Sequence, residues 1–133
     1  MKATIYYLAA CIVAGAIVLA IAATGRAATE ADHRDKWCAG VGETEVITKA
    51  GTRVDCVTAT HAVEFDWGYK WAECLGQALH YANMTGLQAK CVLIVEGGWS
   101  DMQFLQRISG AIAHHKLDVE VELMRKEMSG AAQ

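Results

Sequence analysis

Hydrophobic and polar positions follow strand and helix periodicities in turn along the chain. Four segments alternate with a period of two, which is typical of strands with one buried face: residues 44–50, 53–58, 61–66 and 117–123. Residues 91–96 are continuously apolar, the pattern of a strand covered on both faces. Residues 69–83 have helical spacing and precede Gly86, a helix-ending residue. The pattern predicts one compact unit of strands with helices between some of them.

Two further helices are predicted from their first residues. Thr29, followed by acidic residues, opens a short polar helix that ends near Cys38. Ser100 with Gln103 matches a capping box and predicts a helix to about Lys116. The expected element order is α-β-β-β-α-β-α-β, which defines an α/β (α+β) fold.

The N-terminal segment is expected to enter a membrane. No residue from Ala3 to Gly25 is charged, and the apolar stretch from Ile5 to Ala23 suits a spanning helix. Lys2 precedes this stretch while acidic residues follow Arg26, so the positive-inside rule sends the remainder of the chain across the membrane. We therefore expect an exported protein, either periplasmic or extracellular, or anchored by one N-terminal hydrophobic helix.

The same segment leaves its processing open. Ala20-Ile21-Ala22 fits a signal-peptidase site, so residues 1–27 are a signal peptide or a transmembrane anchor that contacts the membrane through residues 3–25. Lipid attachment at Cys11 and a buried hydrophobic helix are lesser alternatives. Residues 28–133 are expected to form a single domain.

Composition limits the functions of that domain. The chain has 133 residues with 12 basic and 15 acidic side chains, and no acidic residue lies in residues 1–27. Without Lys2 and Arg26 the rest carries a net charge of −5. Proteins that hold nucleic acid by charge alone are basic, so any action on nucleic acid needs a local site with a metal cation.

Four cysteines lie in the exported part, namely Cys38, Cys56, Cys74 and Cys91. An even number in an oxidising compartment favours disulfides, and the absence of a Cys-x-x-C pair disfavours a zinc ribbon or a thioredoxin-like site. Three pairings are possible, and buried free thiols are the alternative. We expect Cys56, on the apolar face of a hairpin, to pair with Cys38 at the end of the first helix.

That hairpin sets two carboxylates against each other. If Ala59 and Thr60 form the turn, Asp55 lies opposite Glu64, with Asp66 on the same face. Arg53 can pair with Asp66, but like charges directly opposite each other destabilise a sheet. A divalent cation such as Mg²⁺ would compensate the pair. A solvated acidic edge is the alternative interpretation.

The helix that follows places Lys70, Gln77 and Tyr81 along one line, separate from its apolar stripe. The combination Asp55-x8-Glu64-x-Asp66, then Lys70 and Gln77-x-x-x-Tyr81, resembles the PD-(D/E)XK nuclease superfamily. More narrowly, residues 53–82 are similar to small bacterial and phage proteins of that fold. The resemblance covers roughly residues 37–123.

The resemblance implies a restriction-endonuclease-like fold, with a mixed sheet and flanking helices, and a Mg²⁺ or Mn²⁺ site. Asp55 and Glu64, with Asp66, would be the metal ligands, while Gln77 and Tyr81 would hold the substrate phosphate or the attacking water. The family's catalytic lysine belongs at position 66, where this chain has an aspartate. Lys70 would have to supply that charge.

The function implied is an exported or membrane-anchored, metal-dependent phosphodiesterase acting on nucleic acid. The alternative is a non-catalytic binding or structural module that keeps the nuclease-like fold. A small disulfide-stabilised exported domain of unrelated fold is a third interpretation.

Overall fold

The structure is a computed structural model that describes residues 26–126. Within this range, residues 28–126 belong to one compact unit. The expected signal peptide or anchor, residues 3–25, lies outside the described residues, as does Cys11. Within residues 26–126, no helix combines the length and hydrophobicity that a membrane span requires.

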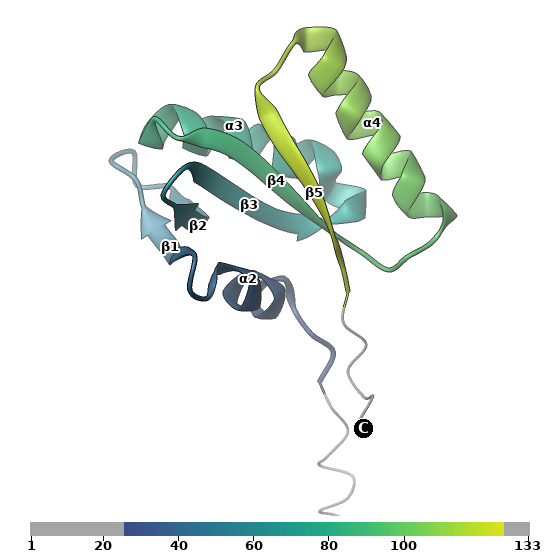
Figure 1. Ribbon diagram of the computed structural model, residues 1–133, viewed down its shortest axis with the longest axis horizontal. Coiled ribbons are helices and arrows are strands. Elements are labelled where there is room, and N and C mark those ends of the chain that lie inside the picture. The colour runs from purple at the N-terminus through teal and green to yellow at the C-terminus, as the bar shows by residue number, and fades with distance from the viewer. Residues whose placement is uncertain (1–25, 127–133) are drawn as a thin grey trace, which may run out of the picture. The chain divides into compact units, whose positions relative to one another are not determined.

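The domain is an α/β fold built on one five-stranded mixed sheet (Figure 1). In chain order its elements are α2 (Glu30–Cys38), β1 (Gly42–Ile47), β2 (Arg53–Thr58), β3 (His61–Trp67), the 3-10 turn η1 (Gly68–Lys70), α3 (Trp71–Thr85), β4 (Gln88–Val95), α4 (Trp99–His115) and β5 (Val119–Arg125). The strands lie in sequence order, β1 to β5. β1, β2 and β3 are antiparallel neighbours, whereas β4 runs parallel to both β3 and β5.

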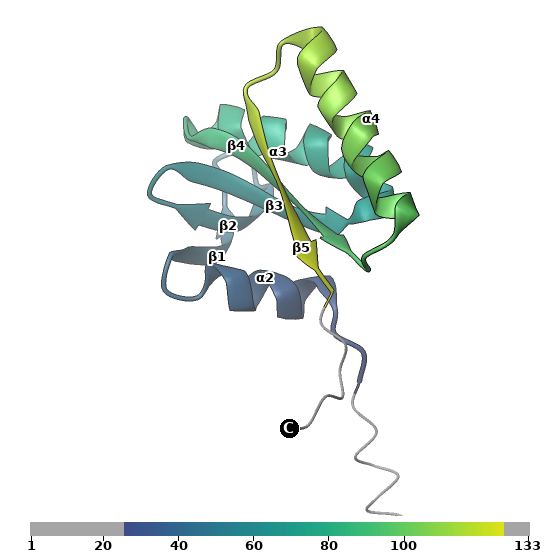
Figure 2. The same cartoon turned by 45° about the vertical axis from the view of Figure 1, so that its right-hand side comes forward.

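Helices cover both faces of the sheet. Figures 1 and 2 show α2 on one face and α3 and α4 on the other. β4 supplies core residues to both layers, as its continuous apolar pattern predicted. Cys91 and Leu93 pack with α3 and with Ile108 of α4, while Val92 packs in the cluster that contains Cys38 of α2.

Two of the three residues or pairs predicted to begin or end a helix are confirmed. Thr29 caps α2 in a capping box with Asp32, and α3 ends at Gly86, whose φ of 73° suits glycine. The predicted Ser100–Gln103 capping box is wrong. Instead, α4 begins after Gly98, and the carboxylate of Asp101 accepts the Gly98 N–H at 2.8 Å. Asp101 is the third residue of α4, the position from which an acidic side chain reaches back to the N–H of the capping residue.

Three predicted strand boundaries were inaccurate. β1 ends at Ile47 because a turn begins at Thr48. In this turn the Thr48 N–H donates a hydrogen bond to the Thr52 carbonyl. β4 begins earlier, at Gln88, since parallel backbone pairing with β3 does not require apolar side chains. β5 covers Val119–Arg125 at the edge of the sheet. Leu123, which the alternation of residues 117–123 assigns to the buried face, is 38% exposed.

Two disulfides join neighbouring layers. The expected Cys38–Cys56 bond is confirmed and fastens the end of α2 to β2. A second bond, Cys74–Cys91, fastens α3 to β4 on the opposite face. Structural disulfides persist in oxidising compartments, so the pair is consistent with a periplasmic or extracellular location.

Each disulfide is expected to stabilise the domain by a similar amount. The separations are 18 and 17 residues, and the chain-entropy model assigns about 3 kcal/mol to loops of this length. The paired variants Cys38→Ala/Cys56→Ala and Cys74→Ala/Cys91→Ala should each lose about this free energy of unfolding in urea titrations. Four free thiols in protein isolated from an oxidising compartment, measured by mass mapping, would contradict this assignment.

Candidate functional site

A polar cavity forms where β2 separates from β3. The hairpin register is as predicted, with Cys56 opposite Val63 and Val57 opposite Ala62. Beyond Cys56 and Val63, toward Asp55 and Glu64, the described residues of the two strands are no longer paired. In place of a β2 backbone group, the carboxylate of Asp55 accepts the N–H of Phe65 at 3.0 Å. A side chain thus satisfies the backbone that the divergence leaves unpaired.

The cavity has a volume of about 520 Å³ and is lined by residues from both helix layers. Its lining comes from α2 (Glu30, Ala31, Arg34), the β1–β2 region (Glu45, Thr52, Arg53, Asp55), β3 (Glu64, Phe65) and α3 (Gln77, Tyr81). Four of these side chains are acidic and two are basic. The excess of carboxylates favours a cationic ligand.

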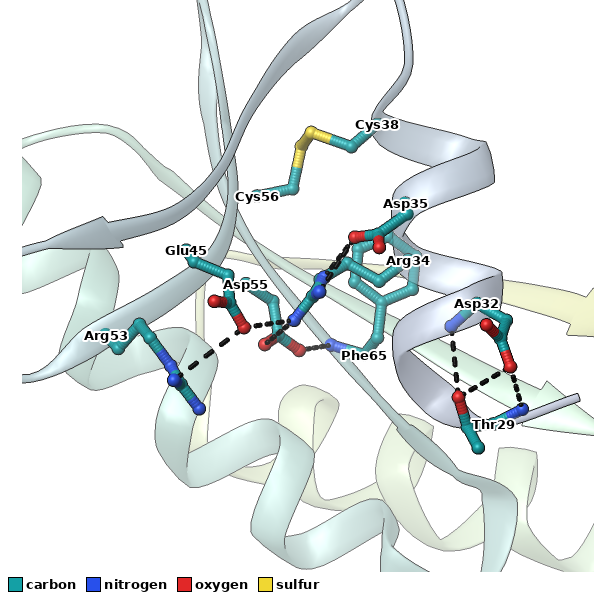
Figure 3. Close-up of polar contacts among 10 residues, drawn as sticks. All are labelled: Thr29, Asp32, Arg34, Asp35, Cys38, Glu45, Arg53, Asp55, Cys56 and Phe65. Atoms are coloured by element: carbon teal, nitrogen blue, oxygen red, sulfur yellow. Dashed lines mark hydrogen bonds and ion pairs between the residues drawn. A yellow bond between two sulfur atoms is a disulfide. The ribbon is translucent and has the colours of Figure 1, made fainter.

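Arg34 is the counter-charge nearest to Asp55 in the structure (Figure 3). Its guanidinium lies 2.8 Å from Glu45 and 3.7 Å from Asp55, and it also pairs with Asp35 of its own helix. Burial raises the pKa of Asp55 above its ordinary value, although the Phe65 N–H and Arg34 act in the opposite direction. Asp55 is therefore partly compensated before any ligand binds.

Glu64 is in a different state. Its residue is only 6% exposed, and its Oε2 atom has no hydrogen-bond partner. Burial, together with the neighbouring Asp55 and Asp66 carboxylates, raises the pKa of Glu64 to about 9. Glu64 therefore holds a proton at neutral pH when no cation is near.

Asp66 and Lys70 form their own pair beside the cavity. Lys70 Nζ lies 3.1 Å from Asp66 and 3.9 Å from Glu30. This contact replaces the expected Arg53–Asp66 pair, since Arg53 instead lies 3.7 Å from Glu45. Burial raises the pKa of Asp66 to about 7 even though Lys70 lowers it. Neither Asp66 nor Lys70 is among the residues that line the cavity.

Gln77 and Tyr81 lie one turn apart on α3 and act as a unit. The Tyr81 hydroxyl donates to Gln77 Oε1 at 3.0 Å. Burial and the nearby Glu64 and Asp55 carboxylates raise the pKa of Tyr81 to about 12, so its hydroxyl stays protonated. The bond uses the amide oxygen of Gln77 as acceptor and leaves the amide nitrogen as a donor toward the cavity.

Glu45 joins the site through an unusual backbone conformation. Its φ is 57°, and it interrupts the β1–β2 pairing between Thr44↔Cys56 and Val46↔Val54. A left-handed glutamate within a strand costs on the order of 1–2 kcal/mol. The strained residue brings its carboxylate to Arg34.

The structure thus brings together four of the residues proposed from sequence: Asp55, Glu64, Gln77 and Tyr81. Sequence analysis missed Arg34, Glu30 and Glu45. The spacing of Glu30 and Arg34, four residues apart, places both on one face of α2. Nothing in the sequence indicates that this face meets β2.

Comparisons with protein-family models, curated proteins and solved structures find no match to this chain. In the part of the chain that the structure describes, no group of three or more His, Cys, Asp or Glu side chains is arranged to hold a metal ion. The fit of a cation therefore rests on two carboxylates, Asp55 and Glu64. The unpartnered Oε2 of Glu64 is the kind of oxygen that a hard divalent cation binds.

The buried proton on Glu64 has a measurable effect on stability. Because the folded state holds this proton up to about pH 9 while an unfolded glutamate releases it near pH 4–5, the stability conferred at low pH is lost as pH rises. The loss is at most about 1.4 kcal/mol per pH unit. Asp66 contributes the same trend only up to about pH 7.

We expect the free energy of unfolding, measured in chelator, to fall between pH 7 and 9. Glu64→Gln keeps the shape of the side chain without its ionisable group. In this variant the free energy of unfolding should change much less between pH 7 and 9. Glu43→Gln, an exposed change on β1, should leave the slope in place. A wild-type protein with no slope between pH 7 and 9 would contradict the buried, protonated state of Glu64.

Proposed function

We propose that the cavity binds a divalent cation, Mg²⁺ or Mn²⁺, between Asp55 and Glu64, and that the protein is an exported, metal-dependent phosphodiesterase acting on nucleic acid. The observation that carries the proposal is the buried, unpartnered carboxyl oxygen of Glu64 beside a second carboxylate. A cation there would supply the Lewis acidity that phosphodiester hydrolysis needs. The order of elements around the site, α-β-β-β-α-β, also supports the proposal.

The remaining lining residues suit an anionic substrate at the mouth of the cavity. Arg53, whose side chain is 61% exposed, is free to turn from Glu45 toward a phosphate group. Gln77 can donate its amide N–H to a phosphate oxygen, held in place by Tyr81. These residues bind and orient the substrate, while Arg34 is committed to carboxylates inside the cavity.

Lys70 has an indirect role in this proposal. It neutralises Asp66, a carboxylate that otherwise adds to the repulsion on Glu64. Lys70 is not among the residues that line the cavity. Lys70 is therefore proposed as a positioning residue, in place of the migrated catalytic lysine suggested by the family resemblance.

A non-catalytic module is the second candidate, and one observation favours it. Arg34 already supplies a positive charge to Asp55 and Glu45, and a proton on Glu64 removes the remaining repulsion. A cavity neutralised in this way can be stable without a metal ion. In that case the acidic residues hold α2 against the sheet and do no chemistry.

Divalent cations separate the two candidates. At pH 7.5, Mn²⁺ or Mg²⁺ should raise the unfolding temperature of the chelator-treated protein, because a ligand that binds only the folded state stabilises it. The same cations should permit cleavage of a labelled oligonucleotide. Glu64→Gln should remove both effects, and Gln77→Ala should reduce cleavage while keeping the stabilisation.

Glu43→Gln is the matched control, since it removes one negative charge from an exposed position outside the cavity. It should leave both effects unchanged. If neither cation stabilises the wild type or permits cleavage, the non-catalytic module becomes the better description.

A further inference from the structure

Large apolar side chains gather at one end of the domain, outside the acidic cavity. Six large hydrophobic residues are exposed in the described part of the chain, and four of them lie here. Their exposed fractions are 82% for Trp99, 65% for Tyr69, 48% for Met102 and 38% for Leu123. We refer to these four residues as the terminal apolar surface.

The four residues surround two adjoining grooves of about 340 Å³ each. Tyr69 lines one groove, Met102 and Leu123 line the other, and both grooves share Val95 and Asp101. The surface is therefore continuous across the ends of β4 and β5. None of the residues that line these grooves also lines the acidic cavity.

Trp99 lies between the two grooves. Gly98, before it, lines one of them, and Ser100, after it, lines the other. Trp99 is the first residue of α4, and it is the most exposed of the large hydrophobic residues described. An indole in this position has an apolar ring system and one polar N–H, a combination suited to a boundary between water and an apolar phase.

Both connections to the rest of the chain leave from this end of the domain. Figures 1 and 2 show the start of α2 and the end of β5 close together. Gly98, which precedes α4, lines the same groove as Leu123 and Arg125 of β5. Lys70, next to Tyr69, lies 3.9 Å from Glu30 at the start of α2. The N–H of Lys126, after β5, donates to the Val95 carbonyl at 2.7 Å.

The chain that precedes α2 restricts what can lie against this surface. The uncharged stretch from Ala3 to Gly25 ends four residues before Thr29, the N-cap of α2. Four residues span at most about 14 Å. If residues 3–25 cross a membrane, this end of the domain is held within that distance of the lipid surface.

We propose that the terminal apolar surface rests in the interfacial layer of the membrane that residues 3–25 enter. Tryptophan and tyrosine are the side chains that favour this layer. A short tether to a membrane-inserted segment would raise the effective concentration of the surface at the membrane. The inference depends on retention of the hydrophobic segment and is independent of the proposed phosphodiesterase activity.

Apolar contact, more than charge, carries this binding. Lys126 extends over the Trp67 ring with its nitrogen 5.5 Å from the ring centroid, and it pairs with Glu96 at 2.7 Å. The residues that line the two grooves include one basic side chain, Arg125, and two acidic ones, Glu96 and Asp101, so the surface has no excess of positive charge. Binding should therefore change little with salt or with the fraction of anionic lipid.

Tryptophan fluorescence tests the proposal on the full chain, residues 1–133, inserted in phosphatidylcholine vesicles. All four tryptophans lie between positions 37 and 99, so the hydrophobic segment adds no tryptophan emission. Lipids brominated near the headgroup should quench the wild type. Trp99→Phe should lose most of that quenching, whereas Trp37→Phe, which removes an indole packed against Phe65, should keep it.

Charge variants test the rest of the surface. Met102→Glu/Leu123→Glu should lower the quenching of Trp99, because each change places a carboxylate against the lipid. Ile47→Glu, which changes a residue 63% exposed on β1, should have no effect. Near-ultraviolet circular dichroism in the same vesicles should show that all variants keep the folded core.

Two results would overturn the proposal. One is wild-type emission that brominated lipids do not quench, or that they quench equally in Trp99→Phe. The other is an unquenched Trp99 together with a dimer that Met102→Glu/Leu123→Glu dissociates in detergent solution, which would assign the surface to a second copy of the chain.

Discussion

Two carboxyl groups in one cavity, the buried Glu64 and the half-buried Asp55, impose the main electrostatic constraint on this domain. Glu64 lies beneath α3 and Asp55 lies on the neighbouring strand, in a space that is acidic overall. Removing like charges from water is costly unless a proton, a basic side chain or a metal ion compensates them. The structure uses Arg34 for Asp55 and a raised pKa for Glu64. The proposed cation would replace the proton on Glu64.

The fold supplies the geometry that this constraint requires. β2 and β3 separate after one short paired stretch, and Asp55 fills the gap by accepting the Phe65 N–H. The Cys38–Cys56 disulfide joins α2 to the residue next to Asp55, and Arg34 lies one turn before Cys38. The covalent bond therefore holds the compensating guanidinium near the carboxylate, as Figure 3 shows. On the opposite face, the Cys74–Cys91 disulfide ties α3 to β4.

Much of this arrangement could be predicted from local sequence patterns. The short link at Ala59 and Thr60 set the hairpin register, and the apolar run in β4 predicted a strand buried on both faces. The helical spacing of Gln77 and Tyr81 predicted their shared position. These features depend on neighbours in sequence, which periodicity describes well.

The remaining features depend on contacts between distant segments. Arg34 is an ordinary polar position on a short helix until α2 packs against β2, so its role has no local signal. The left-handed conformation of Glu45 likewise has no local signal, since neither glycine nor asparagine stands at this position. Leu123 alternates correctly but lies at a sheet edge, and alternation does not show whether a face is covered. Capping residues compete, and Asp101 displaced the predicted Ser100–Gln103 pair.

The central claim is that Glu64 exchanges a buried proton for a divalent cation. Calorimetric titration of Mn²⁺ into the chelator-treated protein at pH 7.5, in two buffers with different ionisation enthalpies, measures the protons released on binding. With a pKa of about 9 for Glu64, the account predicts release of about one proton per cation in the wild type, and no such release from Glu64→Gln. Absence of binding, or binding without proton release, would contradict the account.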